Sequence, residues 1–145
     1  MIPDFNLDGH LPPGLHNSTW AEFEMRFGWT LHRKKLLSGL KRALESLKAA
    51  CCQKVFIDGS FVTSKEIPGD FDGCWDVTGV NPYKLDPILL NFDNGRLAQK
   101  AKYFGELFPD TLSERSSGKT FLDFFSIDKV TGNPKGVVVI DLRGL

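Results

Sequence analysis

The chain has 145 residues, with 18 basic and 18 acidic side chains and a formal net charge of zero, so its length predicts one domain with a substantial core. A zero net charge excludes a global field that recruits nucleic acid or anionic membrane, although it leaves room for a local basic patch. No apolar run approaches the roughly 20 residues of a membrane-spanning helix. Three cysteines without a C-x-x-C pair argue against a cysteine zinc site. We therefore expect a cytoplasmic protein with reduced cysteines, no signal peptide and no membrane contact.

Residues 1–17 are predicted to form an extended arm, because prolines and glycines interrupt any helix there. Apolar side chains along the arm would hold it against the body of the domain. Residues 18–50 are predicted to form a helical block. Its first helix covers about 19–27, where Thr19 and Glu22 have the spacing of a capping box.

The second helix of this block is predicted over about residues 30–50, with a leucine stripe on one face and basic side chains on the other. A solvated face is the simpler interpretation of the basic side, and a patch that meets a polyanionic acceptor such as tRNA is the alternative. Gly39 lies within the leucine stripe, where it costs about 1 kcal/mol relative to alanine, so it indicates close helix packing. The basic face comprises His32, Arg33, Lys34, Lys35, Lys41, Arg42 and Lys48.

Residues 51–145 are expected to form the sheet core, which completes a single domain of the α+β class. Asp86 and Pro87 have the pattern of a helix start, and a further helix is predicted over about 95–108. The last two predicted strands should pair as an antiparallel hairpin. Strands are predicted over residues 54–58, 71–77, 121–127 and 137–142.

The stretch after the first predicted strand carries the candidate chemistry. Gly59 and Ser60 end that strand, and a glycine lets the backbone come close enough to bind phosphate oxygens through its N–H groups. Lys65 follows in a hydroxyl-rich turn and would neutralise a phosphate. Asp70 and Asp72 are separated by one residue, so on a strand they share a face, where their repulsion favours a bound Mg²⁺.

A two-metal site usually needs a third carboxylate from a neighbouring strand. Asp123, among apolar residues of the predicted strand 121–127, is the first candidate, and Asp141 is the second. Asp-x-Asp alone is common, and a Pro-Gly-Asp turn whose aspartate caps backbone groups is the structural alternative. The combination with Gly-Ser and two flanking strands favours a metal site for phosphoryl or nucleotidyl transfer, with a nuclease as a further alternative.

Gly59-Ser60 followed by Asp70-Phe71-Asp72 resembles the signature of the nucleotidyltransferase superfamily that includes DNA polymerase beta, and most closely its minimal nucleotidyltransferases. The whole chain is also similar to a poorly characterised family of short bacterial and phage proteins. That wider similarity lies in segments 11–14, 58–65 and 132–136. The superfamily resemblance implies a small mixed sheet with flanking helices and an NTP bound through Mg²⁺. It further implies transfer of a nucleoside monophosphate to an acceptor hydroxyl on a protein or tRNA.

By position, the resemblance implies that Gly59 and Ser60 contact the triphosphate and that Asp70 and Asp72 bind the metal, with Asp123 completing the set. It also implies a role in a toxin–antitoxin or phage-defence system, with a cognate toxin or antitoxin protein as partner. The alternative is a binding or antitoxin module that keeps the fold without catalysis.

Overall fold

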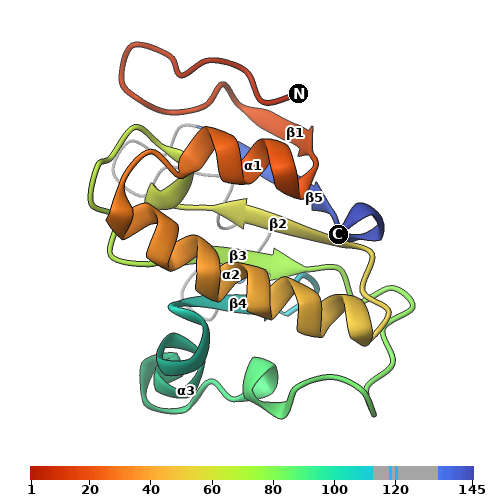
Figure 1. The fold of residues 1–145 in the computed structure, drawn as a ribbon. Coiled ribbons are helices and arrows are strands. Elements are labelled where there is room, and N and C mark those ends of the chain that lie inside the picture. Colours follow the sequence, from red (N-terminus) through yellow and green to blue (C-terminus); the bar gives the residue numbers. More distant parts are fainter. Residues whose placement is uncertain (113–117, 119, 121–133) are drawn as a thin grey trace.

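In the computed structural model, which describes residues 1–112, 118, 120 and 134–145, five strands of the described chain form one mixed sheet in the order β1-β5-β2-β3-β4 (Figure 1). Together with the helices, this sheet confirms the predicted α+β class. The two outer pairs, β1 with β5 and β3 with β4, are parallel, and the two inner pairs are antiparallel. The strands are β1 Gly14–Ser18, β2 Lys54–Asp58, β3 Phe71–Trp75, β4 Gly105–Pro109 and β5 Gly136–Asp141.

Several helices begin at a residue whose side chain caps the first turn. The Thr19 hydroxyl accepts a hydrogen bond from the Glu22 backbone N–H at 3.1 Å, and the Thr30 hydroxyl accepts one from the Arg33 N–H at 3.0 Å. Asp86 caps η2 in the same way through the Ile88 N–H. The α-helices are α1 Trp20–Phe27, α2 Leu31–Ala49 and α3 Asp93–Tyr103, and the 3₁₀ helices are η1 Ser60–Val62, η2 Pro87–Leu90 and η3 Leu142–Gly144.

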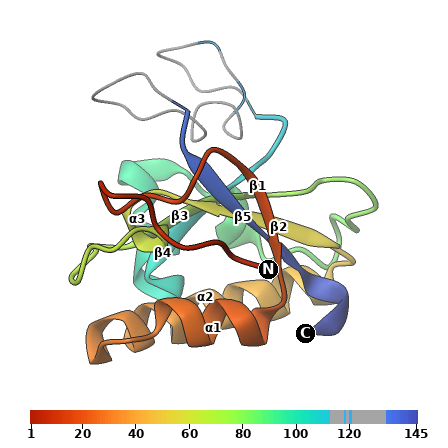
Figure 2. The ribbon, with the colours of Figure 1, turned by 90° about the horizontal axis from the view of Figure 1, so that it is seen from above.

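The two faces of the sheet have different surroundings. Helices α1 and α2 lie on the same side of the sheet, and the main core fills the space between them and that face (Figure 2). Phe56, Cys74 and Phe108 belong to a smaller cluster. Because side chains alternate along a strand, this cluster lies on the opposite face of the sheet. The same alternation places the carboxylates of Asp72 and Glu106 on that opposite face.

Two strands were not predicted as strands. Gly14–Ser18, within the predicted arm, adds β1 to the edge of the sheet beside β5. The predicted helix 95–108 was wrong over its last residues, because the chain leaves the helix at Phe104, which has a left-handed φ of 67°. Residues 105–109 then form β4, with Leu107 in the main core and Phe108 in the smaller one. Apolar side chains on both faces fit a strand better than a one-sided helix.

Gly39 lies where α2 meets the end of α3. A Cβ at this position would lie 2.0 Å from the Tyr103 carbonyl oxygen, so the predicted close helix packing is confirmed. The predicted strand 121–127, and with it the proposed hairpin, lies outside the described residues. No helix in the described part of the chain is both long and apolar enough to cross a membrane.

Candidate metal centre

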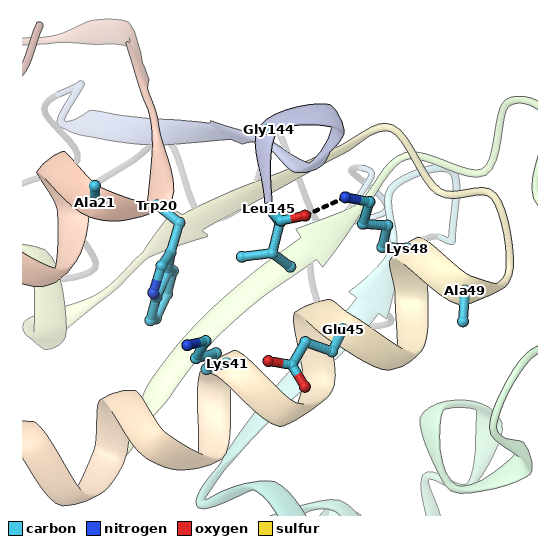
Figure 3. A pocket seen from close by; sticks show the side chains of 8 residues that line it. All are labelled: Trp20, Ala21, Lys41, Glu45, Lys48, Ala49, Gly144 and Leu145. Carbon is cyan, nitrogen blue, oxygen red and sulfur yellow. Dashed lines mark hydrogen bonds between the residues drawn. The ribbon is translucent and has the colours of Figure 1, made fainter.

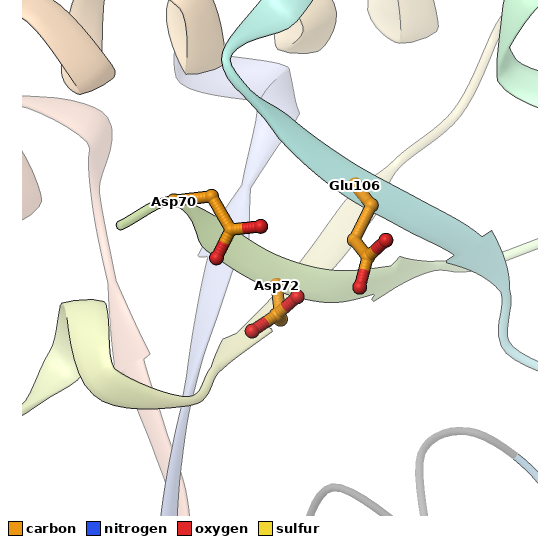
Figure 4. A group of neighbouring side chains, drawn as sticks. All are labelled: Asp70, Asp72 and Glu106. Atoms are coloured by element: carbon orange, nitrogen blue, oxygen red, sulfur yellow. The ribbon is translucent and has the colours of Figure 1, made fainter. Parts of the chain in front are cut away.

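Three carboxylates converge at the end of the sheet face opposite α1 and α2. Asp70 immediately precedes β3, Asp72 lies on β3, and Glu106 lies directly opposite Asp72 on the parallel strand β4. One oxygen from each carboxylate lies within 4.8 Å of the other two (Figure 4). The predicted meeting of Asp70 and Asp72 is therefore present, and these three residues are called the acidic cluster below.

The third carboxylate differs from both residues predicted for that role. Asp123 lies outside the described residues. Asp141 lies opposite Lys54, at the far end of β2 from the acidic cluster, and forms an ion pair with Arg143 at 2.8 Å. Glu106 was missed because it fell inside a predicted helix. The sequence signal at this position is the run Gly105–Pro109, which is apolar apart from Glu106 and led by a glycine, and it fits a strand as well as a helix end.

Within the acidic cluster, the pKa values of Asp72 and Glu106 are shifted in opposite directions. Burial raises the pKa of Asp72 to about 8, with further contributions from its hydrogen bond to Glu106 and from the charges of Asp70, Glu106 and Asp58. Burial is the largest single influence on Glu106 and opposes its ionisation, but several favourable contacts together outweigh it and lower the pKa of Glu106. These contacts are the bond that Arg96 Nε donates to Glu106 Oε2 at 2.6 Å, the hydrogen bond with Asp72, and the charges of Arg96 and Lys100. Glu106 therefore stays ionised, and Asp72 carries the proton when no cation is bound.

The acidic cluster fits a divalent cation. Three carboxylate oxygens at this separation are the hard ligands that Mg²⁺ takes, and a cation between them removes the repulsion that raises the pKa of Asp72. Asp58, a residue that was not predicted as part of the site, lies fully buried opposite Asp72 on β2. It adds further negative charge, with the Lys135 ammonium 3.6 Å from its Oδ1.

A pocket of about 480 Å³, called the Gly59 pocket, opens beside the acidic cluster. It brings the predicted Gly59, Ser60 and Lys65 together with Asp72, which lies on its wall. The arm also reaches this pocket, because the Gly9 carbonyl accepts a hydrogen bond from the Ser64 N–H at 2.9 Å. Its lining residues are Asp8, Gly9, His10, Asp58, Gly59, Ser60, Thr63, Ser64, Lys65, Asp72 and Lys135.

Gly59 is required by both conformation and space. Its φ of +79° is one that side-chain-bearing residues rarely adopt. A Cβ at this position would also lie 2.8 Å from Asp72 Oδ2. The chain turns from Gly59 into η1, where the Val62 N–H donates to the Gly59 carbonyl at 3.3 Å. The glycine thus lets a polar turn close directly over a candidate metal ligand.

Arg33 holds the loop that carries Lys65. The basic-face prediction was wrong for this residue, because its side chain is fully buried and its guanidinium lies 3.7 Å from the centroid of the Trp29 ring. Burial lowers the pKa of Arg33 to about 10, which still leaves it charged at neutral pH. Its guanidinium donates hydrogen bonds of 2.6–3.2 Å to the carbonyls of Phe27, Phe61, Thr63 and Lys65.

A larger cavity, of about 680 Å³, has a different lining (Figure 3). It is formed by α1, α2 and the segment after β5, where the Lys48 ammonium donates to the Leu145 carbonyl. Among the described residues that line it, Glu45 has the one acidic side chain. The cavity therefore lacks the converging ligands that distinguish the Gly59 pocket.

Comparison with known proteins gives one match. Residues 3–141 match the model of a family described as "Family of unknown function (DUF6932)". No curated protein and no solved structure matches the chain.

Proposed function

The chain belongs to this family of unknown function, DUF6932, and we propose from its site that it is a Mg²⁺-dependent nucleotidyltransferase that moves a nucleoside monophosphate from an NTP to an acceptor hydroxyl. The observation that supports this most is the position of Asp72. It belongs to the acidic cluster and also lines the Gly59 pocket, so a metal and a phosphate chain would meet at one carboxylate.

Different residues of the site would bind the metal and the phosphate chain. Asp70, Asp72 and Glu106 would hold Mg²⁺, which neutralises charge on the phosphates and on the leaving group. The turn at Gly59 and Ser60, together with Lys65 from the pocket lining, would bind the phosphate chain. Because Arg33 fixes the Lys65 carbonyl, the turn is held in place before a nucleotide arrives.

The proposed reaction is a balanced group transfer. The acceptor hydroxyl oxygen forms a bond to the α-phosphorus of the NTP, and the bond from that phosphorus to the oxygen of the β-phosphate breaks. Pyrophosphate leaves, and the hydroxyl proton passes to water. The chain's part is mostly positioning and charge neutralisation, as is usual for phosphoryl chemistry.

A binding or antitoxin module without catalysis is the alternative function, and it would be favoured by an incomplete set of carboxylates. Glu106 supplies a third carboxylate, which supports the enzyme instead. We retain a protein or tRNA as the acceptor class and a toxin–antitoxin or phage-defence setting as part of the proposal. A cytoplasmic location also belongs to it, because NTP and Mg²⁺ are available there and the described cysteines are unpaired.

Label transfer from α-³²P NTPs tests this function. Purified protein is incubated with each NTP and Mg²⁺, together with total cellular RNA or protein, and transfer is compared with that of the Asp70→Asn/Asp72→Asn double variant. Asp141→Asn is the matched control, since it removes a carboxylate on the same sheet far from the cluster. We expect transfer by the wild type and the control only. If the double variant binds ATP–Mg²⁺ and transfers label like the wild type, the site assignment is wrong.

A further inference from the structure

A further pocket, of about 450 Å³, includes Asp70 of the acidic cluster in its lining and is called the Asp70 pocket. Asp72 lines the Gly59 pocket, whereas Asp70 lines this one. Since oxygens of both aspartates lie within 4.8 Å of each other, ligands in the two pockets would meet at the same cluster. The Asp70 pocket is lined by His32, Lys35, Leu36, Gly69, Asp70, Lys100 and Phe104.

The lining of the Asp70 pocket contains more basic than acidic side chains. His32 and Lys35 come from the first turns of α2 and Lys100 from α3, so the lining holds three basic side chains and one carboxylate. The Lys100 ammonium lies 3.8 Å from Glu106 Oε2, which joins this basic lining directly to the acidic cluster. A ligand with negative charge beside its reacting group would therefore be favoured here.

An aromatic ring lies within this basic lining. The Lys35 ammonium lies 5.3 Å from the centroid of the Phe104 ring, and the Arg42 guanidinium lies 5.1 Å from the same ring. Arg42 thus extends the positive charge beyond the pocket along α2. Cations that alternate with an aromatic ring are typical of surfaces that hold single-stranded nucleic acid.

We propose that the Asp70 pocket binds the acceptor, and that the acceptor is the end of a single nucleic-acid strand, where a hydroxyl lies next to a phosphate. This rests on the proposed function, because transfer needs an acceptor hydroxyl that reaches the α-phosphorus on the side opposite the leaving pyrophosphate. Phosphates of the strand contact Lys35 and Lys100, and the terminal hydroxyl lies toward Asp70. A protein hydroxyl would lack the adjacent phosphate that this lining selects.

Strand binding and nucleotide binding are measured separately in the full chain. Fluorescence anisotropy of a 5′-labelled single strand with a free 3′ hydroxyl, as RNA and as DNA, reports on the Asp70 pocket. Fluorescence of an N-methylanthraniloyl-ATP–Mg²⁺ complex reports on the Gly59 pocket. The variants are Lys35→Glu, its matched control Lys34→Glu on the adjacent exposed position outside the pocket, and Lys65→Ala.

We expect Lys35→Glu to weaken strand binding about tenfold, as loss and reversal of a phosphate contact implies, while Lys34→Glu changes it about twofold or less. Lys35→Glu should leave nucleotide binding unchanged, and Lys65→Ala should weaken it. Equal binding of RNA and DNA would assign recognition to the phosphates, and preference for RNA would add a 2′-hydroxyl contact.

Two results overturn the acceptor site alone: equal effects of Lys34→Glu and Lys35→Glu, or label transfer to protein that is unaffected by Lys35→Glu. Absence of ATP–Mg²⁺ binding in the wild type overturns the proposed function, and the acceptor role is lost with it.

Discussion

A methyl group at Gly59 would lie 2.8 Å from Asp72 Oδ2, so the turn after β2 and the candidate metal ligand on β3 are packed against each other without room for a side chain. Asp58 and Asp72 are paired in the sheet just before this contact. The Gly-Ser pair and the Asp-x-Asp pair are thus two parts of one structure, although Gly59 and Asp70 are eleven positions apart in the sequence.

Gly59→Ala should lower both stability and metal affinity. The left-handed φ of +79° makes any side chain unfavourable by about 1–2 kcal/mol, and the new methyl group must also displace the Asp72 carboxylate. Urea denaturation measures the first effect and calorimetric titration with Mn²⁺ the second. Gly79→Ala is the matched control, because Gly79 has a φ of +76° with nothing within 4 Å of its Cβ position. Equal loss of Mn²⁺ affinity in both variants would contradict the proposed contact.

The stability of the metal-free protein should depend on pH through Asp72. Its pKa is raised to about 8 in the folded chain and returns to about 4 on unfolding, so the folded state binds the extra proton between these values. The contribution of Asp72 to the free energy of unfolding is therefore fully present below about pH 4 and is lost as pH rises through 8. In EDTA, we expect Asp72→Asn to raise the melting temperature relative to wild type more at pH 8.5 than at pH 5.5.

Metal should reverse this pH dependence. Mg²⁺ or Mn²⁺ competes with the proton on Asp72, so the rise in melting temperature that metal produces should be larger at pH 8.5 than at pH 5.5. Asp72→Asn should remove most of that rise, whereas Asp141→Asn, at the far end of β2, should retain it. Scanning calorimetry at the two pH values measures all of these effects. A rise that is the same in wild type and Asp72→Asn would argue against Asp72 as a ligand.

The local features of the fold were predictable from the sequence, whereas the pairings across the sheet were not. Capping residues and leucine spacing located α1 and α2, because these features act within a few residues. Strand β4 depends on contact with β3, more than thirty positions earlier, and Gly105-Glu106-Leu107-Phe108 fits a helix end equally well in isolation. The sequence alone could therefore not place Glu106 opposite Asp72.

The candidate site was also only partly predictable from the sequence. Gly59, Ser60, Lys65, Asp70 and Asp72 lie along one continuous stretch, and the structure brings them to one region. Arg33 was interpreted as a surface residue because its neighbours in the sequence are charged. Its burial depends on the carbonyls of a loop about thirty positions away, which a helical pattern alone does not predict.

Arg33→Lys should be strongly destabilising despite the retained charge. A lysine ammonium has three donors on a flexible stem and cannot replace the planar guanidinium, so buried carbonyls such as those of Phe61 and Thr63 lose their donors at about 1–3 kcal/mol each. Arg143→Lys is the control, since the ion pair of Arg143 with Asp141 is exposed and the substitution should change stability little.

Hydrogen exchange separates the loop effect of Arg33→Lys from general destabilisation. The Ser64 N–H, which donates to the Gly9 carbonyl, should exchange much faster in this variant, whereas amides at the centre of β2 should follow only the change in global stability. Nucleotide binding should weaken together with the loss of protection at Ser64. If the Ser64 amide and the β2 amides lose protection equally, Arg33 stabilises the whole fold and does not position this loop.

Glu106→Gln tests whether the third metal ligand is Glu106, as in the structure, or Asp123, which the sequence favoured. The substitution keeps the size of the side chain but removes the charge that pairs with Arg96 at 2.6 Å and completes the acidic cluster. Mn²⁺ affinity should fall by about tenfold or more, because a cluster of three carboxylates becomes one of two. Asp123→Asn should change the affinity by less than about twofold if Glu106 is the ligand. The reverse result, with affinity retained in Glu106→Gln and lost in Asp123→Asn, would return the third ligand to Asp123 and leave Glu106 as the ion-pair partner of Arg96.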